Sequence, residues 1–216
     1  MRPLSGLCAL FLASAAAVSA GPMVDWRLDQ GPNFVGEAPV TVLGNPQALA
    51  DGNWHYAQFN GVSDGYIVER NPLEGWTRFS IELLVRADPD GEGEPRFLNI
   101  GDANGTVLTM EFRLGKDSSW ALDGYVKQEE VHLKLFDETR RHPAGKWHWV
   151  ALTYDGKTLT SYVDGQKELS GEVALRPFTA GRTSFGVRLN HVYWFKGGIA
   201  EFRATRRVLG PEELAR

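Results

Sequence analysis

Glu111 and Arg113 are two residues apart in the predicted strand 106–114, and they are the clearest candidates for chemistry in this chain. Alternate residues of a strand point to the same face, so their side chains are expected to lie side by side. The pair would suit an acidic-polysaccharide lyase, with Arg113 neutralising a uronate carboxylate and Tyr125 or His132 acting as the base. The alternative is a surface ion pair, which strand faces commonly carry. A glycosidase would need a pair of catalytic carboxylates, and the sequence has no Glu-x-Asp-x-x-Glu run that would supply them. No catalytic residue is therefore assigned.

Four aromatic residues with polar neighbours are candidates for binding a sugar: Trp120, Tyr125, Tyr193 and Trp194. Flat aromatic rings stack on the C–H faces of sugars, while nearby polar and charged side chains bind the hydroxyl groups. Together with Arg113, these four residues form the predicted ligand-binding set. The competing interpretation is that single rings among them pack in the core.

Metal ligands are sparse in the sequence. The five histidines do not pair at the spacing of zinc ligands, and there is no His-Glu-x-x-His motif. Calcium needs several converging oxygen ligands, and the candidates are Asp25, Asp29, Asp64, Asp102 and Asn104. These residues also suit turns, which is the simpler interpretation. No metal-ligand set is therefore assigned, and calcium is kept as an alternative.

The segment 146–165 predicts the strands around which the rest of the fold is arranged. Asp155-Gly156 and Asp164-Gly165 can adopt the positive φ angles that two-residue hairpin turns need. The strand 147–154 carries apolar side chains on both faces, which indicates a position inside a sheet and not at its edge.

About a dozen predicted strands, separated by Gly-, Pro-, Asn- and Asp-rich turns, fill the rest of the chain. The segment 29–52 is interpreted as loops around one strand at 40–43, and a short helix is expected to begin at Pro211. In the strand 106–114 the even-numbered residues from Leu108 onward are apolar and predict the core face. The pattern is typical of an all-β, two-sheet antiparallel β-sandwich, and no linker divides it.

Residues 1–20 have the features of a secretory signal peptide. Arg2 precedes an apolar run that is too short to span a membrane, and Val18-Ser19-Ala20 fits a cleavage site. The mature domain is then predicted to comprise residues 21–216 without a disulfide, because the only cysteine, Cys8, is removed. The missing disulfide favours a bacterial periplasmic or extracellular protein. The net charge of −4 argues against nucleic acid as a partner, and no further apolar stretch predicts a membrane span.

Three segments carry a family resemblance: 57–86, 147–165 with the run Trp-His-x-Val-Ala-Leu-Thr-Tyr-Asp-Gly, and 195–215. They resemble the laminin-G-like jelly rolls of the concanavalin A-like lectin/glucanase superfamily, in the order that the family has. Members often hold calcium at a sandwich edge through an Asp in the pattern Gly-x-Ile-Asp-Glu. This chain has Ala200 before Glu201 there, and because Ala cannot ligate a metal, the resemblance does not carry the calcium site over.

These observations favour a secreted or periplasmic recognition module without catalytic activity, whose partner is a carbohydrate such as a polysaccharide or a cell-surface glycan. Fold alone does not give function, so two alternatives stay open. A polysaccharide lyase or glycosidase of the same superfamily would need a convergent carboxylate, Tyr or His group in a groove. A protein-interaction module would show a flat surface with an exposed apolar patch.

Overall fold

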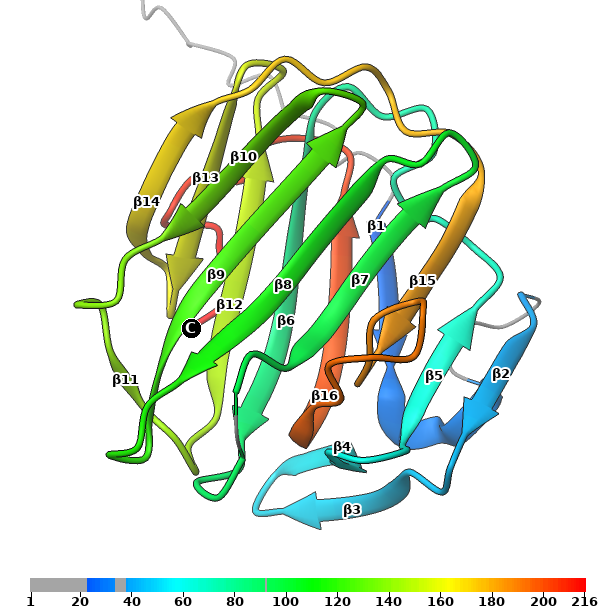
Figure 1. The fold of residues 1–216 in the computed structure, drawn as a ribbon, viewed down its shortest axis with the longest axis vertical. Coiled ribbons are helices and arrows are strands. Elements are labelled where there is room, and N and C mark those ends of the chain that lie inside the picture. Colours follow the sequence, from blue (N-terminus) through cyan, green and yellow to red (C-terminus); the bar gives the residue numbers. More distant parts are fainter. Residues whose placement is uncertain (1–22, 34–37, 92) are drawn as a thin grey trace, which may run out of the picture.

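The computed structural model describes residues 23–33, 38–91 and 93–216, and it shows two antiparallel sheets packed face to face (Figure 1). The predicted all-β, two-sheet sandwich of the jelly-roll type is confirmed. The predicted signal peptide lies outside the described residues. Within the described part, no helix has the length and apolar character needed to cross a membrane.

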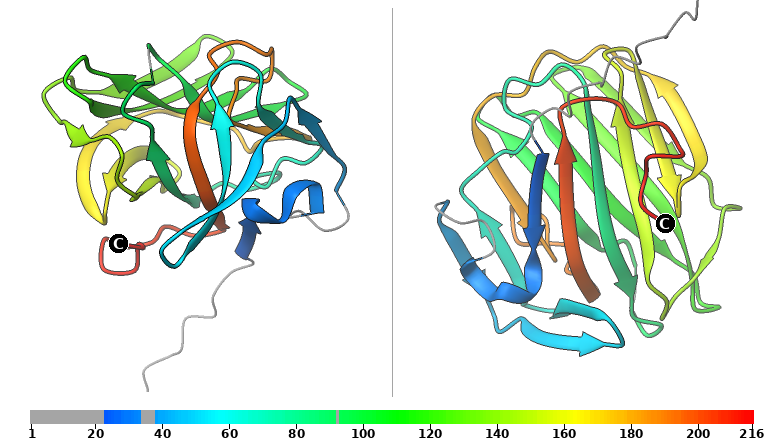
Figure 2. Two further views of the ribbon diagram at one scale, coloured as in Figure 1. Left: turned by 90° about the horizontal axis from the view of Figure 1, so that it is seen from below. Right: turned by 180° about the vertical axis from the view of Figure 1, so that it is seen from behind.

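Sheet A forms the rear layer in Figure 1 and faces the viewer in the right-hand view of Figure 2. Its strand order is β14 (Gln166–Glu172), β13 (Thr158–Val163), β12 (His148–Tyr154), β6 (Phe79–Ala87), β16 (Lys196–Thr205), β4 (Trp54–Asn60) and β3 (Gln47–Asp51). A further strand, β1 (Met23–Arg27), pairs with β16 and leads into the 3-10 helix η1 (Leu28–Asn33).

Sheet B forms the front layer in Figure 1. Its strand order is β10 (Val131–Phe136), β9 (Ser119–Gln128), β8 (Val107–Leu114), β7 (Arg96–Asp102), β15 (Gly181–Phe185), β5 (Gly65–Val68) and β2 (Val40–Leu43). The two-residue strand β11 (His142–Pro143) pairs with the beginning of β9.

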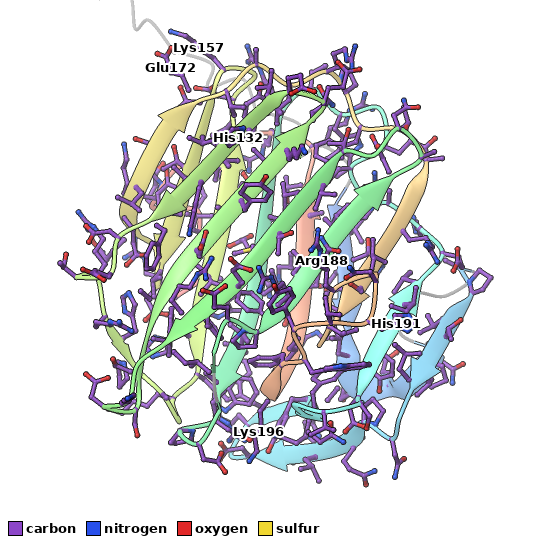
Figure 3. All side chains as sticks on the ribbon, viewed as in Figure 1. His132, Lys157, Glu172, Arg188, His191 and Lys196 are labelled. Carbon is purple, nitrogen blue, oxygen red and sulfur yellow. The ribbon has the colours of Figure 1, made fainter. Side chains whose placement is uncertain are left out.

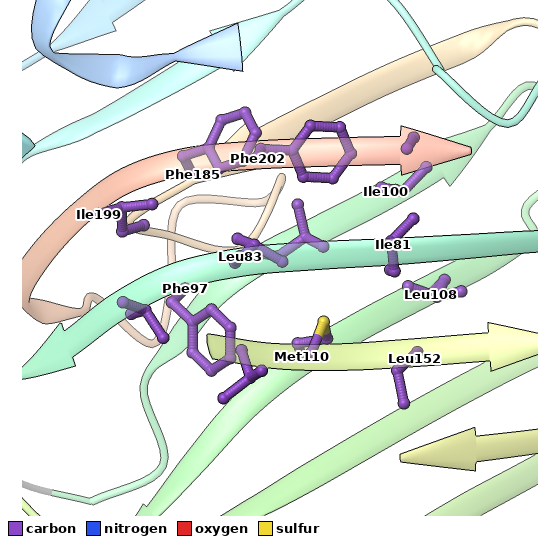
Figure 4. Close-up of a cluster of buried hydrophobic side chains, with 14 of the residues drawn as sticks. Ile81, Leu83, Phe97, Ile100, Leu108, Met110, Leu152, Phe185, Ile199 and Phe202 are labelled. Carbon is purple, nitrogen blue, oxygen red and sulfur yellow. The ribbon is translucent and has the colours of Figure 1, made fainter. Parts of the chain in front are cut away.

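The core lies between the two sheets and follows the predicted alternation. On β8, Leu108, Met110 and Phe112 are fully buried and face the residues of β6 and β12 (Figure 4). Apolar side chains that leave water in this way supply most of the stability of such a sandwich. Because these three residues point inward, the odd-numbered residues of β8 must point outward.

The central hairpin lies inside sheet A as predicted, since β12 pairs with both β13 and β6. Asp164 and Gly165 adopt φ angles of 49° and 73° and form the predicted two-residue turn between β13 and β14. The two-residue turn predicted at Asp155-Gly156 is wrong, because Asp155, Gly156 and Lys157 together connect β12 to β13. The Asp155 carboxylate accepts hydrogen bonds from the N–H groups of Lys157 and Thr158 (2.8 and 2.7 Å) and stabilises this longer connection.

Two other local predictions are wrong. The segment 29–52 contains a second strand, β3, which pairs with β4 through residues that are all exposed. A strand without a buried face has no alternation of apolar residues by which the sequence could reveal it. The segment after Gly210 forms a single hydrogen-bonded turn, not a helix, because Leu209 and Leu214 both pack against Ala151 and Tyr162 on sheet A.

The outer face of sheet A is partly covered by this C-terminal segment, which crosses it in the right-hand view of Figure 2. The backbone N–H of Ala215 donates a hydrogen bond to the Glu82 carboxylate (2.8 Å) and fixes the segment in place. This cover explains why β12 is apolar on both faces, since its outer residues are buried by the C-terminal segment as well as by neighbours in the sheet. The outer face of sheet B is hollowed instead, and the candidate site lies there.

Phe112 offers a direct test of this arrangement. Its ring lies 4.4 Å from the Phe97 ring and 4.3 Å from the Trp120 ring, and it is fully buried. We expect Phe112→Ala to lower the free energy of unfolding by about 3–5 kcal/mol, measured by urea titration, because it leaves a cavity between the sheets. The matched control is Val131→Ala on the exposed side of β10, which should change the free energy by less than about 0.5 kcal/mol. Equal losses in the two variants would contradict the assigned core.

Candidate functional site

A hollow of about 420 Å³ lies on the outer face of sheet B. Its floor is formed by β8 and β9, and the loop 186–195 between β15 and β16 contributes Arg188, which reaches over the sheet in Figure 3. We call this hollow the sheet B groove; it is lined by Arg96, Val107, Thr109, Glu111, Arg113, Tyr125, Lys127, Lys134 and Arg188. The volume is in the range of small-ligand sites, which is about 300–1,000 Å³.

The register of β8 and β9 brings the polar side chains of the floor together. Thr109 lies opposite Tyr125, and Glu111 lies opposite Asp123. Side chains directly opposite each other on one face of an antiparallel pair are close enough to interact. Arg113 follows Glu111 on the same face, so one guanidinium is in reach of two carboxylates.

Arg113 is the centre of an ion cluster at the floor of the sheet B groove. Its Nη2 lies 2.7 Å from Glu111 Oε1, and its Nε donates to Asp123 Oδ2 at 2.8 Å. Lys134 Nζ lies 3.2 Å from the same oxygen of Asp123, whose side chain is fully buried. Buried carboxylates are stable in ionised form only with such partners, so the cluster holds these side chains in fixed positions.

Arg96 joins the cluster from β7. Its guanidinium contacts the Glu111 carboxylate. The same group stacks on the Tyr193 ring, with the guanidinium carbon 3.7 Å from the ring centroid. The backbone N–H of Arg96 also donates a hydrogen bond to the backbone carbonyl oxygen of Tyr193 at 3.0 Å. Tyr193 and His191 both adopt left-handed φ angles, 60° and 61°, which non-glycine residues adopt rarely and which recur at binding sites. The Tyr193 ring is therefore held in place although it is 47 % exposed.

The environment of Glu111 changes its acidity. Burial raises the pKa of the Glu111 carboxyl to about 7, against the attraction of Arg96 and with a further increase from neighbouring Asp123. A carboxyl group with such a pKa exchanges its proton near neutral pH. The floor of the groove can therefore both accept and donate hydrogen bonds.

Three of the five predicted site residues lie together. Arg113 and Tyr125 line the sheet B groove, and Tyr193 stands beside it on Arg96. Trp194 is half-buried with its ring 6.4 Å from the His191 ring, and it does not line the groove.

The assignment of Trp120 to the ligand-binding surface is wrong. Its side chain is 1 % exposed and packs in the core against Phe112, His142 and His148. The reason is strand alternation, because Trp120 and Tyr125 stand at positions of opposite parity in β9 and must point to opposite faces.

Several residues of the groove and of the ion cluster beneath it were missed from the sequence: Arg96, Asp123, Lys127, Lys134 and Arg188. Asp123 and Lys127 could have been found from the sequence, because each lies two residues from Tyr125 in the predicted strand and so points to the same face. The remaining three come from other strands or from a loop, and only the tertiary structure places them. His132, one proposed base, is exposed on β10 and does not line the groove.

Two of the acidic residues considered for calcium, Asp102 and Asp64, accept backbone hydrogen bonds that stabilise loops. Asp102 accepts hydrogen bonds from the N–H groups of Asn104 and Thr106 with one oxygen and from Thr179 with the other. Asp64 accepts one from the N–H of Asn45. Among residues 23–33, 38–91 and 93–216, no three His, Cys, Asp or Glu side chains gather as a metal site would require.

The raised pKa of Glu111 predicts a pH dependence of stability. Since the pKa is raised from 4.5 in the unfolded chain to about 7 in the folded chain, this group's stabilising effect is complete below pH 4.5 and is lost as pH rises through 7. We expect urea titrations of the native protein and Glu111→Gln to differ in this window by on the order of 1–3 kcal/mol, with the flatter profile in the variant. The control is Glu130→Gln in the exposed β9–β10 turn, which should keep the native slope. Parallel profiles for native protein and Glu111→Gln would contradict the assignment.

Comparison with solved structures identifies the same architecture in an arabinanase domain and in toxin binding domains. Domain 4 of an extracellular arabinanase from Geobacillus stearothermophilus, solved with arabinotriose, is 19% identical; the match covers 90% of this chain and 97% of that one, with a TM-score of 0.67. The botulinum neurotoxin serotype D binding domain is 15% identical over 90% of this chain and 50% of that one (TM-score 0.64). A botulinum neurotoxin DC binding domain, solved with SialylT, is 14% identical over 81% and 44% (TM-score 0.59). The chain thus spans about half of these toxin domains.

Sequence comparison gives the family. No curated protein sequence matches the chain. The family model described as the concanavalin A-like lectin/glucanases superfamily, of the laminin G type, matches residues 59–215. That match spans most of both sheets, from the end of β4 to the C-terminal turn. The chain therefore belongs to the laminin G branch of the concanavalin A-like lectin/glucanases superfamily.

Proposed function

We propose that this protein is a secreted or periplasmic carbohydrate-binding module without catalytic activity, and that it binds its saccharide in the sheet B groove. The observation that carries the proposal is the groove itself, which combines the ring of Tyr125 with the hydrogen-bonding groups of Thr109 and Arg113. The ring of Tyr193 stands at its rim. A protein-interaction module would be better served by a flat surface than by this hollow.

The physical basis is stacking combined with fixed polar groups. Aromatic rings contact the C–H faces of a sugar, and charged groups bind its hydroxyls with directional hydrogen bonds. Arg113 and Arg96 are already held by Glu111 and its neighbours, so little side-chain freedom is lost when a ligand binds. Such a preorganised site favours ligand binding, because little conformational entropy is lost when the ligand binds.

The comparisons and the sequence support the proposal independently. The arabinanase domain, which the chain matches over nearly its full length, was solved with a bound oligosaccharide. The apolar segment before Ala20 supports export from the cytoplasm with cleavage at that residue. The proposal includes no calcium, since no three acidic side chains gather as a metal site would require in the described part of the chain, so binding measured in calcium and in EDTA should agree.

Calorimetry with a panel of polysaccharides tests this proposal. We expect at least one saccharide to bind, and Tyr125→Ala and Tyr193→Ala each to weaken its binding about five- to tenfold, because a stacking surface is lost. The control is Trp54→Ala, which removes an exposed ring from β4 of sheet A and should leave the affinity unchanged. If Trp54→Ala weakened binding and the two Tyr variants did not, the ligand would lie on sheet A and the site assignment would be wrong.

A second candidate function, a polysaccharide lyase or glycosidase, is favoured by one observation. Glu111, whose pKa is about 7, lines the same groove as Tyr125 and lies opposite the buried Asp123, which places an acid and a phenol in one groove with a second carboxylate beneath it. Against it, both carboxylates are engaged by Arg113.

Catalysis has its own test. If the protein is a binding module, incubation with the same panel should release no new reducing ends and no unsaturated uronate product. Product formation that disappears in Glu111→Gln would establish the enzyme and overturn the non-catalytic proposal. Product that persists in Glu111→Gln at the native rate would indicate a contaminating activity and leave the binding function in place.

A further inference from the structure

We propose that the sheet B groove selects a negatively charged saccharide, and that Lys127 and Arg188 hold its carboxylate or sulfate group. The inference rests on the proposed function and narrows it from carbohydrates in general to one chemical class. It follows from which cations of the groove are already paired and which are not.

Three of the five cations in the groove are paired with carboxylates of the protein. Arg96 pairs with Glu111, Lys134 pairs with Asp123, and Arg113 pairs with Asp123 and with Glu94 at the rim. These cations belong to the ion cluster at the floor and keep it stable without a ligand. They set the shape of the groove and do not by themselves call for an anionic partner.

Lys127 and Arg188 are different. In the part of the chain that the structure describes, neither side chain forms an ion pair or a hydrogen bond, although both line the groove. Lys127 extends from β9 on the same face as Tyr125, and Arg188 reaches in from the loop 186–195 (Figure 3). Two cations from separate elements thus face one hollow without a counter-charge.

The balance of charge in the groove is positive even when every nearby carboxylate is ionised. The five cations face Glu111 and Asp123 at the floor and Glu94 at the rim, where it contacts Arg113. The surplus of two positive charges is the pair Lys127 and Arg188, and it occurs in a chain whose net charge is −4. A concentration of positive charge in one hollow of an acidic protein attracts anions locally.

The chemistry of the two side chains fits a carboxylate or a sulfate. The planar guanidinium of Arg188 can donate two parallel hydrogen bonds to two oxygens of one anionic group, and the Lys127 ammonium adds a mobile point charge. A neutral sugar would leave both cations uncompensated in a partly desolvated groove. A nucleic acid strand would need positive charge beyond the hollow, where Glu94 lies at one edge and Glu129 and Glu130 follow Lys127 in the β9–β10 turn.

The experiment compares probes that differ only in charge. An oligogalacturonate is paired with its methyl ester, and a short dextran sulfate is paired with unsulfated dextran, each titrated into the full protein at low salt. We expect one charged probe to bind at least tenfold tighter than its neutral counterpart, and the preferred pair distinguishes a carboxylate ligand from a sulfated one. The preference should decrease as salt is added, because screening weakens the charge contribution.

Variants assign the effect to the two residues. Lys127→Gln and Arg188→Gln should each weaken binding of the charged probe about tenfold, or ~1.4 kcal/mol, and leave binding of the neutral probe within twofold. The matched controls, Lys167→Gln and Arg206→Gln, each remove one positive charge from an exposed residue, on β14 and after β16, and should leave both affinities unchanged.

The outcomes separate the inference from the proposed function. Equal binding of charged and neutral probes would overturn the inference and leave carbohydrate binding in place. A loss in the control variants as large as in Lys127→Gln and Arg188→Gln would show a bulk charge effect and overturn the inference. Absence of binding to every saccharide would overturn both, and binding of a single-stranded oligonucleotide in their place would identify a nucleic acid site.

Discussion

The packing of the inner face of β8 against sheet A is the contact on which both the fold and the candidate site depend. Leu108, Met110 and Phe112 are fully buried between the layers. A shift of the β8 register by one residue would expose these three side chains and bury Glu111 and Arg113 in their place, at a large cost in free energy. The apolar contact therefore determines which residues reach the outer face, and the groove is its consequence on the other side of the same strand.

The groove adds an electrostatic constraint to this geometric one. Glu111 and Asp123 lie opposite each other, and two neighbouring carboxylates repel unless a cation or a proton separates them. Arg113 supplies the cation, and burial, with a smaller contribution from Asp123, raises the pKa of Glu111 so that a proton is also held there more readily. Removing one member would leave its partners charged and buried, so the cluster behaves as a unit and fixes the floor on which a ligand would rest.

The sequence predicted the sandwich well because apolar and polar residues alternate along its strands, as in β6 and β8. It failed at β3, whose residues are all exposed, and at the C-terminal turn, whose conformation follows from contacts with Ala151 and Tyr162. These elements are defined by pairing partners distant in sequence, and a local pattern cannot contain that information. For the same reason the family resemblance gave the architecture and left the ligand open.

The candidate site was predictable only in part. The alternation of side chains along a strand predicts which strand residues share a face, but it does not place residues of loops. Parity within β9 separates Tyr125 from Trp120, and applying it would have removed Trp120 and suggested Asp123 and Lys127 from the sequence alone. It could not have found Arg188, because a loop has no periodicity and its position over sheet B comes from its own turn, closed by the hydrogen bond from Arg188 N–H to the Val192 carbonyl oxygen.

Net charge is a poor guide to the ligand of a protein like this one. The value of −4 belongs to the whole chain, and most of its acidic residues do not line the sheet B groove. Salt screens exposed charges beyond about 8 Å at physiological ionic strength, so an approaching ligand responds mainly to the side chains around the hollow. Those are five cations and three carboxylates, and Glu111, with a pKa of about 7, is only partly ionised at neutral pH. The argument from total charge against a nucleic acid partner therefore does not extend to a small anionic ligand of this groove, whose local charge has the opposite sign.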